Sequence, residues 1–275
     1  GVAGIEADAQ GVTGVKLADG NVVPAGLVVV GIGVTANDQL AKAAGLECDR
    51  GIVVDACART ADPAIVAAGD QWYPLALGRQ LDDAILHMRT NELDIGTWLI
   101  KTEGDAAAVQ AMDATLQANA NHWLVRETLG LLRRTFSRLD VSSRSLFALI
   151  EPGSCFAGSF LELALACDRS YQLILPDDAA LTPKIAVGET NFGLFPMITG
   201  QSRLQRRFYD EQPALDAVRA VAGQPLDADA AFALGLVTSN PDDIDWADET
   251  RIAIEERVSM SPDALTGMEA NLRVN

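Results

Sequence analysis

Two acidic residues and a glycine-punctuated turn occupy one stretch of the sequence and have the side-chain types needed for proton transfer. An apolar strand is predicted over residues 146–150, a turn over 152–159, and an apolar helix that begins near Phe160 and carries Glu162. A second acid, Glu189, follows in the segment GETNFG. Backbone N–H groups at a helix N-terminus stabilise negative charge, as an oxyanion hole does. Two carboxylates beside such a spot can divide the roles of acid and base.

Each glutamate taken alone also has a purely structural explanation. A glutamate in the first turn of a helix interacts with the helix macrodipole or caps the helix without any catalytic role. Glu189, beside a glycine turn, is no more specific. The hypothesis of a catalytic site therefore depends on the two acids and the turn occurring together.

Three segments, in the same order along the chain, resemble the crotonase (enoyl-CoA hydratase/isomerase) superfamily. Residues 158–168, GSFLELALACD, resemble its first motif, and Glu189, Gly193 and Pro196 reproduce its second, E-x-x-x-G-x-x-P. Residues 222–237 resemble its late segment. Within the superfamily, the chain resembles the benzoyl-CoA-dihydrodiol lyases most. The similar stretches are residues 80–87, 91–98, 150–160 and 260–267. The resemblance implies an α/β fold, a truncated spiral of ββα units, over residues 71–275.

The resemblance assigns roles to individual residues. Glu162 and Glu189 match the two catalytic glutamates, and the backbone N–H of Ser159 matches the second oxyanion-hole donor. Residues 104–109 differ from the family's usual loop, so the first donor is not placed. Because Glu162 lies near a helix N-terminus, we expect it to be ionised and Glu189 to be the more readily protonated acid. Three further residues are candidates for the substrate pocket: Glu151, Cys155 and Phe160.

The reaction implied by the resemblance is that of a carbon–carbon lyase in aerobic benzoate degradation. A ring-oxygenated benzoyl-CoA thioester is opened by addition of water, with release of formate and a semialdehyde CoA ester. Neither a metal nor a redox cofactor is implied. We expect a cytoplasmic enzyme whose partner is the CoA thioester. We also expect any homo-oligomer to be weakened, because the C-terminal helices that complete trimers in the family are missing.

Residues 1–70 differ from the rest and resemble the FAD/NAD-dependent reductases that serve ferredoxins. Residues 28–34 and 40–46 resemble the exit of their NAD-binding domain, and residues 60–70 resemble a late flavin motif whose final Asp, here Asp70, contacts the ribityl chain. No complete G-x-G-x-x-G loop follows a strand, so we expect FAD binding to be absent. The pattern predicts a hairpin over 12–23, strands over 27–30 and 51–55, and a helix over 38–44. We place the domain boundary between residues 70 and 71.

Composition and charge restrict the classes of partner. The chain has 275 residues and a net charge of −17, which argues against nucleic acid as a partner. An anionic CoA ester needs a local basic patch, for which two arginine groups are candidates: 133, 134 and 138, and 203, 206 and 207. The four cysteines lack metal-ligand or CxxC spacing. No apolar run is long enough to span a bilayer.

Three hypotheses from different classes follow from these observations. The first is a CoA-thioester lyase of crotonase type. The second is a fragment of an FAD/NAD(P)H-dependent ferredoxin reductase, on account of residues 28–70. The third is a non-catalytic fused or truncated product, on account of the abrupt change at residue 70, and it predicts exposed apolar surface and lost oligomerisation.

Overall fold

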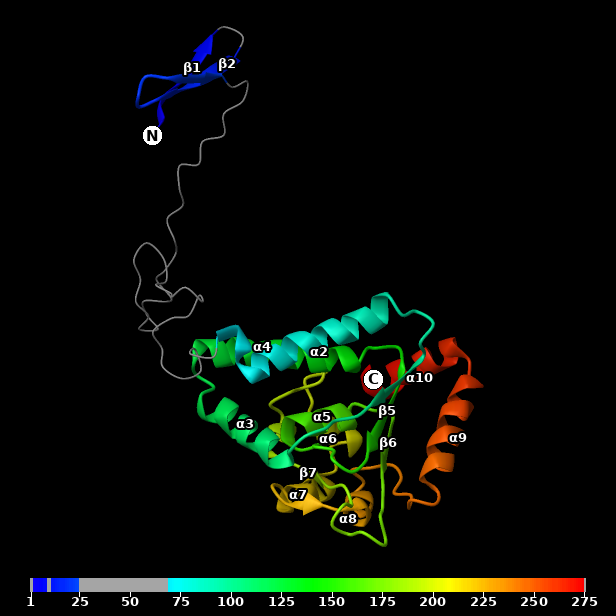
Figure 1. Cartoon of the computed structure of the whole chain (residues 1–275). Helices are drawn as coiled ribbons and strands as arrows, with labels where there is room; N and C mark the ends of the chain where they lie inside the picture. The colour runs from blue at the N-terminus through cyan, green and yellow to red at the C-terminus, as the bar shows by residue number, and fades with distance from the viewer. Residues whose placement is uncertain (1, 9–10, 25–68, 275) are drawn as a thin grey trace. The chain divides into compact units, whose positions relative to one another are not determined.

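The computed structural model describes residues 2–8, 11–24 and 69–274 (Figure 1). The chain divides into two compact units, Gly1–Ala61 and Asp62–Asn275, here called the first and second units. The elements predicted over 27–30, 38–44 and 51–55, and the side chain of Asp70, lie outside the described residues.

The described part of the first unit is an antiparallel sheet of three strands in the order β1-β2-β3. The strands are β1 (Val2–Asp8), β2 (Gly11–Leu17) and β3 (Val22–Pro24). The turn between β2 and β3 forms because Gly20 adopts a φ of +90° and the Asp19 carboxylate accepts the Asn21 N–H at 3.0 Å. The predicted hairpin is therefore confirmed.

The second unit is organised around a parallel sheet in the order β4-β5-β6. The strands are β4 (Thr97–Ile100), β5 (Ser145–Ile150) and β6 (Arg169–Gln172). Every residue of the central strand β5 is buried, which explains its continuous apolar sequence. Helix α5 (Gly158–Leu165) connects β5 to β6, in the way parallel strands require.

Two long helices, α2 (Tyr73–Thr90) and α4 (Trp123–Leu139), lie side by side above the sheet (Figure 1). They approach closely at Gly78, where a β-carbon would lie 3.0 Å from the Leu131 side chain. The amphipathic sequence of residues 123–139 predicts a helix with one apolar stripe. The structure confirms it, because all members of the stripe are buried: Val125, Leu129, Leu132, Phe136 and Leu139.

Several of the remaining elements pack against α5. Helix α3 (Ala106–Ala118) packs against α5, as does the short 3₁₀ helix η2 (Glu189–Phe192). Strands β7 (Ile185–Ala186) and β8 (Pro225–Leu226) pair antiparallel. The others are η1 (Gly69–Gln71), α6 (Arg203–Arg207), α7 (Gln212–Ala220), α8 (Ala228–Ala233), α9 (Trp246–Val258) and α10 (Pro262–Val274).

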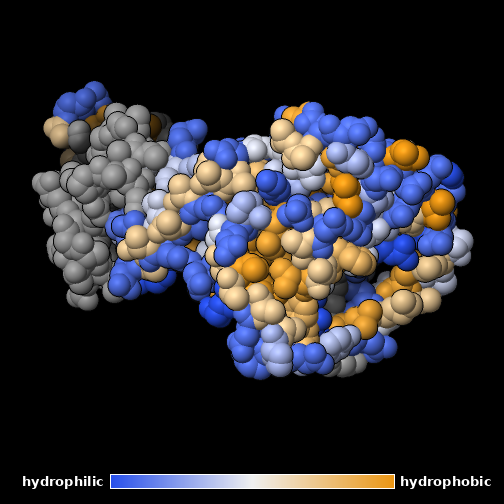
Figure 2. Space-filling model, turned by 90° about the horizontal axis from the view of Figure 1, so that it is seen from below, coloured by the Kyte–Doolittle hydropathy of each residue, from blue (hydrophilic) through white to orange (hydrophobic). Residues whose placement is uncertain are grey.

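The surface is mixed in hydropathy. On the face shown in Figure 2, hydrophobic residues gather near the centre and hydrophilic residues surround them. Large hydrophobic side chains that are exposed in the described residues include Leu181, Phe232, Ile244 and Met268. Among the helices described, none has the length and hydrophobicity that crossing a membrane requires.

Candidate functional site

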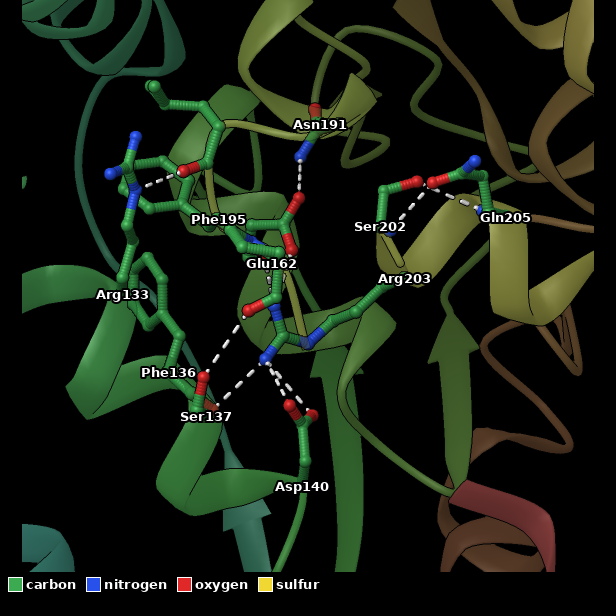
Figure 3. Close-up of polar contacts among 12 residues, drawn as sticks. Arg133, Phe136, Ser137, Asp140, Glu162, Asn191, Phe195, Ser202, Arg203 and Gln205 are labelled. Carbon is green, nitrogen blue, oxygen red and sulfur yellow. Dashed lines mark hydrogen bonds and ion pairs between the residues drawn. The ribbon is translucent and has the colours of Figure 1, made fainter. Parts of the chain in front are cut away.

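Glu162 lies on α5 and belongs to a buried polar network. Its side chain is 1% exposed. One carboxylate oxygen, Oε1, accepts a 2.7 Å hydrogen bond from the side-chain amide of Asn191. The other, Oε2, accepts a 2.7 Å hydrogen bond from the guanidinium of Arg203, as Figure 3 shows. Both oxygens of this predicted catalytic acid therefore already have partners in the protein.

Arg203, the first residue of α6, is the centre of the network (Figure 3). Besides Glu162 it binds both carboxylate oxygens of Asp140, at 3.0 and 2.9 Å. It also donates to the carbonyl oxygens of Phe136 and Phe195 at 3.0 and 3.1 Å. One buried cation is thus shared by two buried carboxylates, and the network joins α4, α5 and α6.

These contacts correct the expectation that residues 203, 206 and 207 form a basic patch for CoA. Arg203 is almost completely buried, because it neutralises internal carboxylates, and it cannot meet a CoA phosphate. Arg206 and Arg207 each donate to a backbone carbonyl, those of Leu272 and Gly235 respectively. In the other arginine group, Arg138 is partly buried against Asp82 at 2.6 Å.

Burial determines the protonation tendency of Glu162. Loss of solvent raises the pKa of its carboxyl, the nearby Asp140 adds to this, and Arg203 and Asn191 oppose it by less. This direction is the opposite of the one expected from the helix N-terminus. The physical reason is that Glu162 lies a full turn inside α5 and has lost its contact with water.

Asn191 connects this network to the turn that carries Glu189. Its side-chain amide also donates to the carbonyl of Gly158 at 2.8 Å, and its side-chain oxygen accepts the N–H of Gly188 at 2.9 Å. The turn at the start of η2 is therefore held against the first turn of α5. Glu162 contributes to this arrangement through its bond to Asn191.

Glu189, the first residue of η2, has different surroundings. Its side chain is 63% exposed and pairs with Arg219 of α7 at 3.2 Å. The Arg219 guanidinium also lies 3.8 Å from the centre of the Phe192 ring, so it covers η2. Glu189 lines a hollow formed by α3, the start of η2 and the segment after α7, with Gln110, Asp113, Ala114, Gln117, Gly188, Thr190, Ala222 and Gly223. Glu162 is not among the lining residues.

The backbone N–H of Ser159, predicted as an oxyanion donor, is engaged by a residue that neither motif contains. It donates a 2.7 Å hydrogen bond to Oδ2 of Asp113, a buried residue of α3. The same oxygen accepts the Thr190 hydroxyl at 3.1 Å. One signal in the sequence marked Asp113: it falls on the apolar stripe of its helix, between Val109 and Leu116.

The three candidate pocket residues do not line this hollow. Glu151 accepts hydrogen bonds from Lys101 at 2.6 Å and from the Trp246 indole at 3.2 Å. Cys155 and Phe160 are buried in one apolar cluster, and burial raises the pKa of the Cys155 thiol. Their role in a substrate pocket stays a prediction. Within the described residues, no group of three or more His, Cys, Asp or Glu side chains is placed to hold a metal ion.

Solved structures show which fold the second unit has. An enoyl-CoA hydratase from Bacillus halodurans matches with a TM-score of 0.53 and 17% identity, over 72% of this chain and 76% of that chain. An enoyl-CoA hydratase/carnithine racemase from Magnetospirillum magneticum matches with a TM-score of 0.53 and 20% identity, over 72% and 70%. The second unit has the crotonase fold. The expected fold class is thereby confirmed.

In sequence comparisons, the crotonase-fold unit and the beginning of the chain match different proteins. A benzoyl-CoA-dihydrodiol lyase from Aromatoleum evansii is 58% identical over 209 residues, which is 76% of this chain but 37% of the relative. The family described as pyridine nucleotide-disulphide oxidoreductase matches residues 1–85. A probable ferredoxin reductase from Castellaniella defragrans is 55% identical over 69 residues, 25% of this chain and 17% of the relative.

Both predicted resemblances are confirmed by these matches, and the chain joins reductase-like sequence to lyase-like sequence. It spans little more than a third of the length of the lyase relative. The position of the junction stays a prediction, since the family match extends to residue 85 and the compact units divide at 61/62.

Proposed function

We propose that the crotonase-fold unit is a carbon–carbon lyase that acts on a ring-oxygenated benzoyl-CoA thioester. Water adds to the ring, a C–C bond breaks, and formate and a semialdehyde CoA ester are released. The 58% identity to a benzoyl-CoA-dihydrodiol lyase over 209 residues carries this proposal. A reaction without metal or redox cofactor and a cytoplasmic location are parts of the same proposal.

Glu189 is the carboxylate that we place beside the substrate. It lines the hollow described above and is mostly exposed, so water and a ligand can reach it. Its ion pair with Arg219 is also exposed, and a pair of this kind is weak because water screens it. In the proposed reaction Glu189 takes a proton from the attacking water.

Glu162, the other predicted catalytic acid, has a geometry that favours a positioning role. Its two carboxylate oxygens are bonded to Asn191 and Arg203. Through Asn191 it holds the turn on which Glu189 lies. In the proposal, Glu162 therefore acts on the reaction by keeping Glu189 in place, and loss of its charge affects both folding and rate.

A direct assay tests the lyase proposal. The purified protein is incubated with a ring epoxide of benzoyl-CoA, formate is assayed, and the CoA product is identified by mass spectrometry. Wild-type protein is expected to release formate, and Glu189→Gln protein prepared in the same way is expected to release very little. No formate from the wild type overturns the lyase proposal, and equal rates from both proteins overturn the role of Glu189.

A second candidate function is favoured by the match of residues 1–85 to pyridine nucleotide-disulphide oxidoreductases. Under this alternative the chain binds FAD and reduces it with NAD(P)H. A visible absorption spectrum before and after incubation with FAD tests it. A colourless protein that retains no FAD after gel filtration excludes the reductase. The third alternative, a non-catalytic product, is excluded by cooperative unfolding together with formate release.

A further inference from the structure

Asp113 is a buried acid that lies outside both sequence motifs. It belongs to α3, is 5% exposed, and its oxygen Oδ1 has no hydrogen-bond partner in the described structure. Burying a carboxyl oxygen without a partner costs free energy, so an unpartnered oxygen in a native fold calls for an explanation. The apolar packing of α3 does not supply one, because an alanine or leucine would serve it better.

The surrounding backbone is shaped to hold this carboxyl in place. The Ser159 N–H and the Thr190 hydroxyl both donate to Oδ2, at 2.7 and 3.1 Å. Gly158 adopts a φ of +46°, and a β-carbon at that position would collide with the same oxygen. Residues at the start of α5 and in η2 thus converge on Oδ2, whereas Oδ1 is buried without a hydrogen-bond partner.

Asp113 also lines the hollow that contains Glu189. Among the residues lining this hollow, Asp113 and Glu189 are the titratable ones. Arg219 is the charged group that pairs with Glu189. Burial raises the pKa of Asp113, and the hydrogen bonds from Ser159 and Thr190 lower it by less. Two carboxyls in one site whose surroundings differ in this way can divide acid and base roles.

We infer that Asp113 is a further catalytic residue, the proton donor that works opposite Glu189 in the same hollow. The inference rests on the proposed lyase function. Opening of the epoxide by water requires that one proton is removed from the water and that one proton is donated to the epoxide oxygen. A bond forms between the oxygen of water and a ring carbon while that carbon's bond to the epoxide oxygen breaks. Glu189 takes the proton that water loses, Asp113 protonates the released oxygen, and a diol results. Exchange with solvent then returns both carboxyls to their starting states.

Ser159 acquires a different role under this inference. Its N–H cannot bind a thioester oxygen while it donates to Asp113. It therefore positions the acid, and stabilisation of the thioester oxygen falls to another group. The competing interpretation is that the Asp113 carboxylate only blocks the Ser159 N–H and must move away before substrate binds. In that case, replacement of Asp113 increases activity.

The test compares Asp113→Asn with Asp105→Asn, which makes the same substitution on the capping residue of the same helix. For Asp113→Asn we expect kcat for formate release to fall by about 10²–10⁴-fold with little change in KM. We also expect the alkaline limb of its pH profile to disappear. Asp105→Asn is expected to keep the wild-type rate and profile, since asparagine also caps helices. Unchanged or increased kcat in Asp113→Asn overturns the inference.

A binding measurement separates failure of this inference from failure of the lyase proposal. The protein is labelled with ¹³C at aspartate carboxyls, and the Asp113 resonance is assigned by its absence in Asp113→Asn. The resonance is expected to titrate above the ordinary aspartate range and to move when benzoyl-CoA is added to saturation. If wild-type protein releases no formate but this signal moves, the reaction is wrong and Asp113 still faces the ligand. A signal that titrates normally, or that benzoyl-CoA leaves unmoved, overturns the role of Asp113.

Discussion

The guanidinium of Arg203 donates a 2.7 Å hydrogen bond to Glu162, although the two residues are 41 positions apart and their side chains are both 1% exposed. This contact ties α6 to α5, and Glu162 in turn accepts a hydrogen bond from Asn191 of η2 (Figure 3). A motif residue that looks like a catalytic acid in the sequence is thereby also part of the buried framework of the site. The consequences for folding and for rate can be separated by mutation.

Replacement of Arg203 by Met is expected to destabilise the second unit strongly. It leaves the carboxylates of Glu162 and Asp140 buried without their cation, and breaking a buried pair in this way costs about 3–5 kcal/mol. The free energy of unfolding in urea at neutral pH measures the effect. Arg126→Met, which removes an exposed arginine from α4, is the control and should change little. Equal stability of the two variants would show that the network does not form.

The two motif glutamates are expected to differ when each is changed to glutamine. Glu189→Gln should leave the unfolding free energy nearly unchanged, because its side chain is mostly exposed, and should lower kcat by about 10²–10⁴-fold. Glu162→Gln should cost about 1–3 kcal/mol of stability, since its amide N–H must face either Arg203 or Asn191, which are both donors. Urea titrations and formate assays on the same preparations check both. A loss of stability in Glu189→Gln but not in Glu162→Gln would contradict the structural role assigned to Glu162.

Stability should depend on pH through Asp113. Its pKa is raised in the folded state, so between the ordinary value of about 4 and the raised value the folded protein binds more protons than the unfolded chain. The stabilising contribution is fully present below the ordinary pKa and is lost as pH rises through the raised one. Asp113→Asn removes this dependence and should therefore gain stability relative to wild type as pH rises. Unfolding free energies of both proteins across this pH range provide the measurement, and a constant difference would refute the expectation.

A β-carbon at residue 158 should disturb the site through Asp113. Gly158→Ala places a side chain at positive φ, which costs about 1–2 kcal/mol, and adds a collision with the Asp113 carboxylate. Gly200→Ala is the control, because that glycine also has positive φ but nothing lies within 4 Å of the added carbon. In an Asp113→Ala background the cost of Gly158→Ala should fall by about 1 kcal/mol or more. A double-mutant cycle of unfolding free energies tests this coupling, and strict additivity would exclude it.

Local patterns in the sequence determined several elements of the described structure. The predicted helix over residues 123–139 coincides with α4, and its apolar stripe is the buried one. The apolar run at 146–150 is the central strand β5, and the turn around Gly20 joins β2 to β3. These features follow from side-chain periodicity and from backbone preferences of neighbouring residues, which are both visible in a short stretch. The motifs located Glu162 and Glu189 in the same way.

The partners of those acids were decided by the tertiary structure. Arg203 lies in a basic cluster that the sequence offers as a candidate for CoA contact, yet packing of α6 against α5 buries it between Glu162 and Asp140. Asp113 reaches the N–H of Ser159 across 46 positions because α3 packs on α5. Which charge meets which donor depends on how distant elements dock, and docking reflects the sum of many weak contacts over the whole core. The residue types of the site can therefore be read along the chain, whereas its hydrogen bonds and protonation states arise only when the chain is folded.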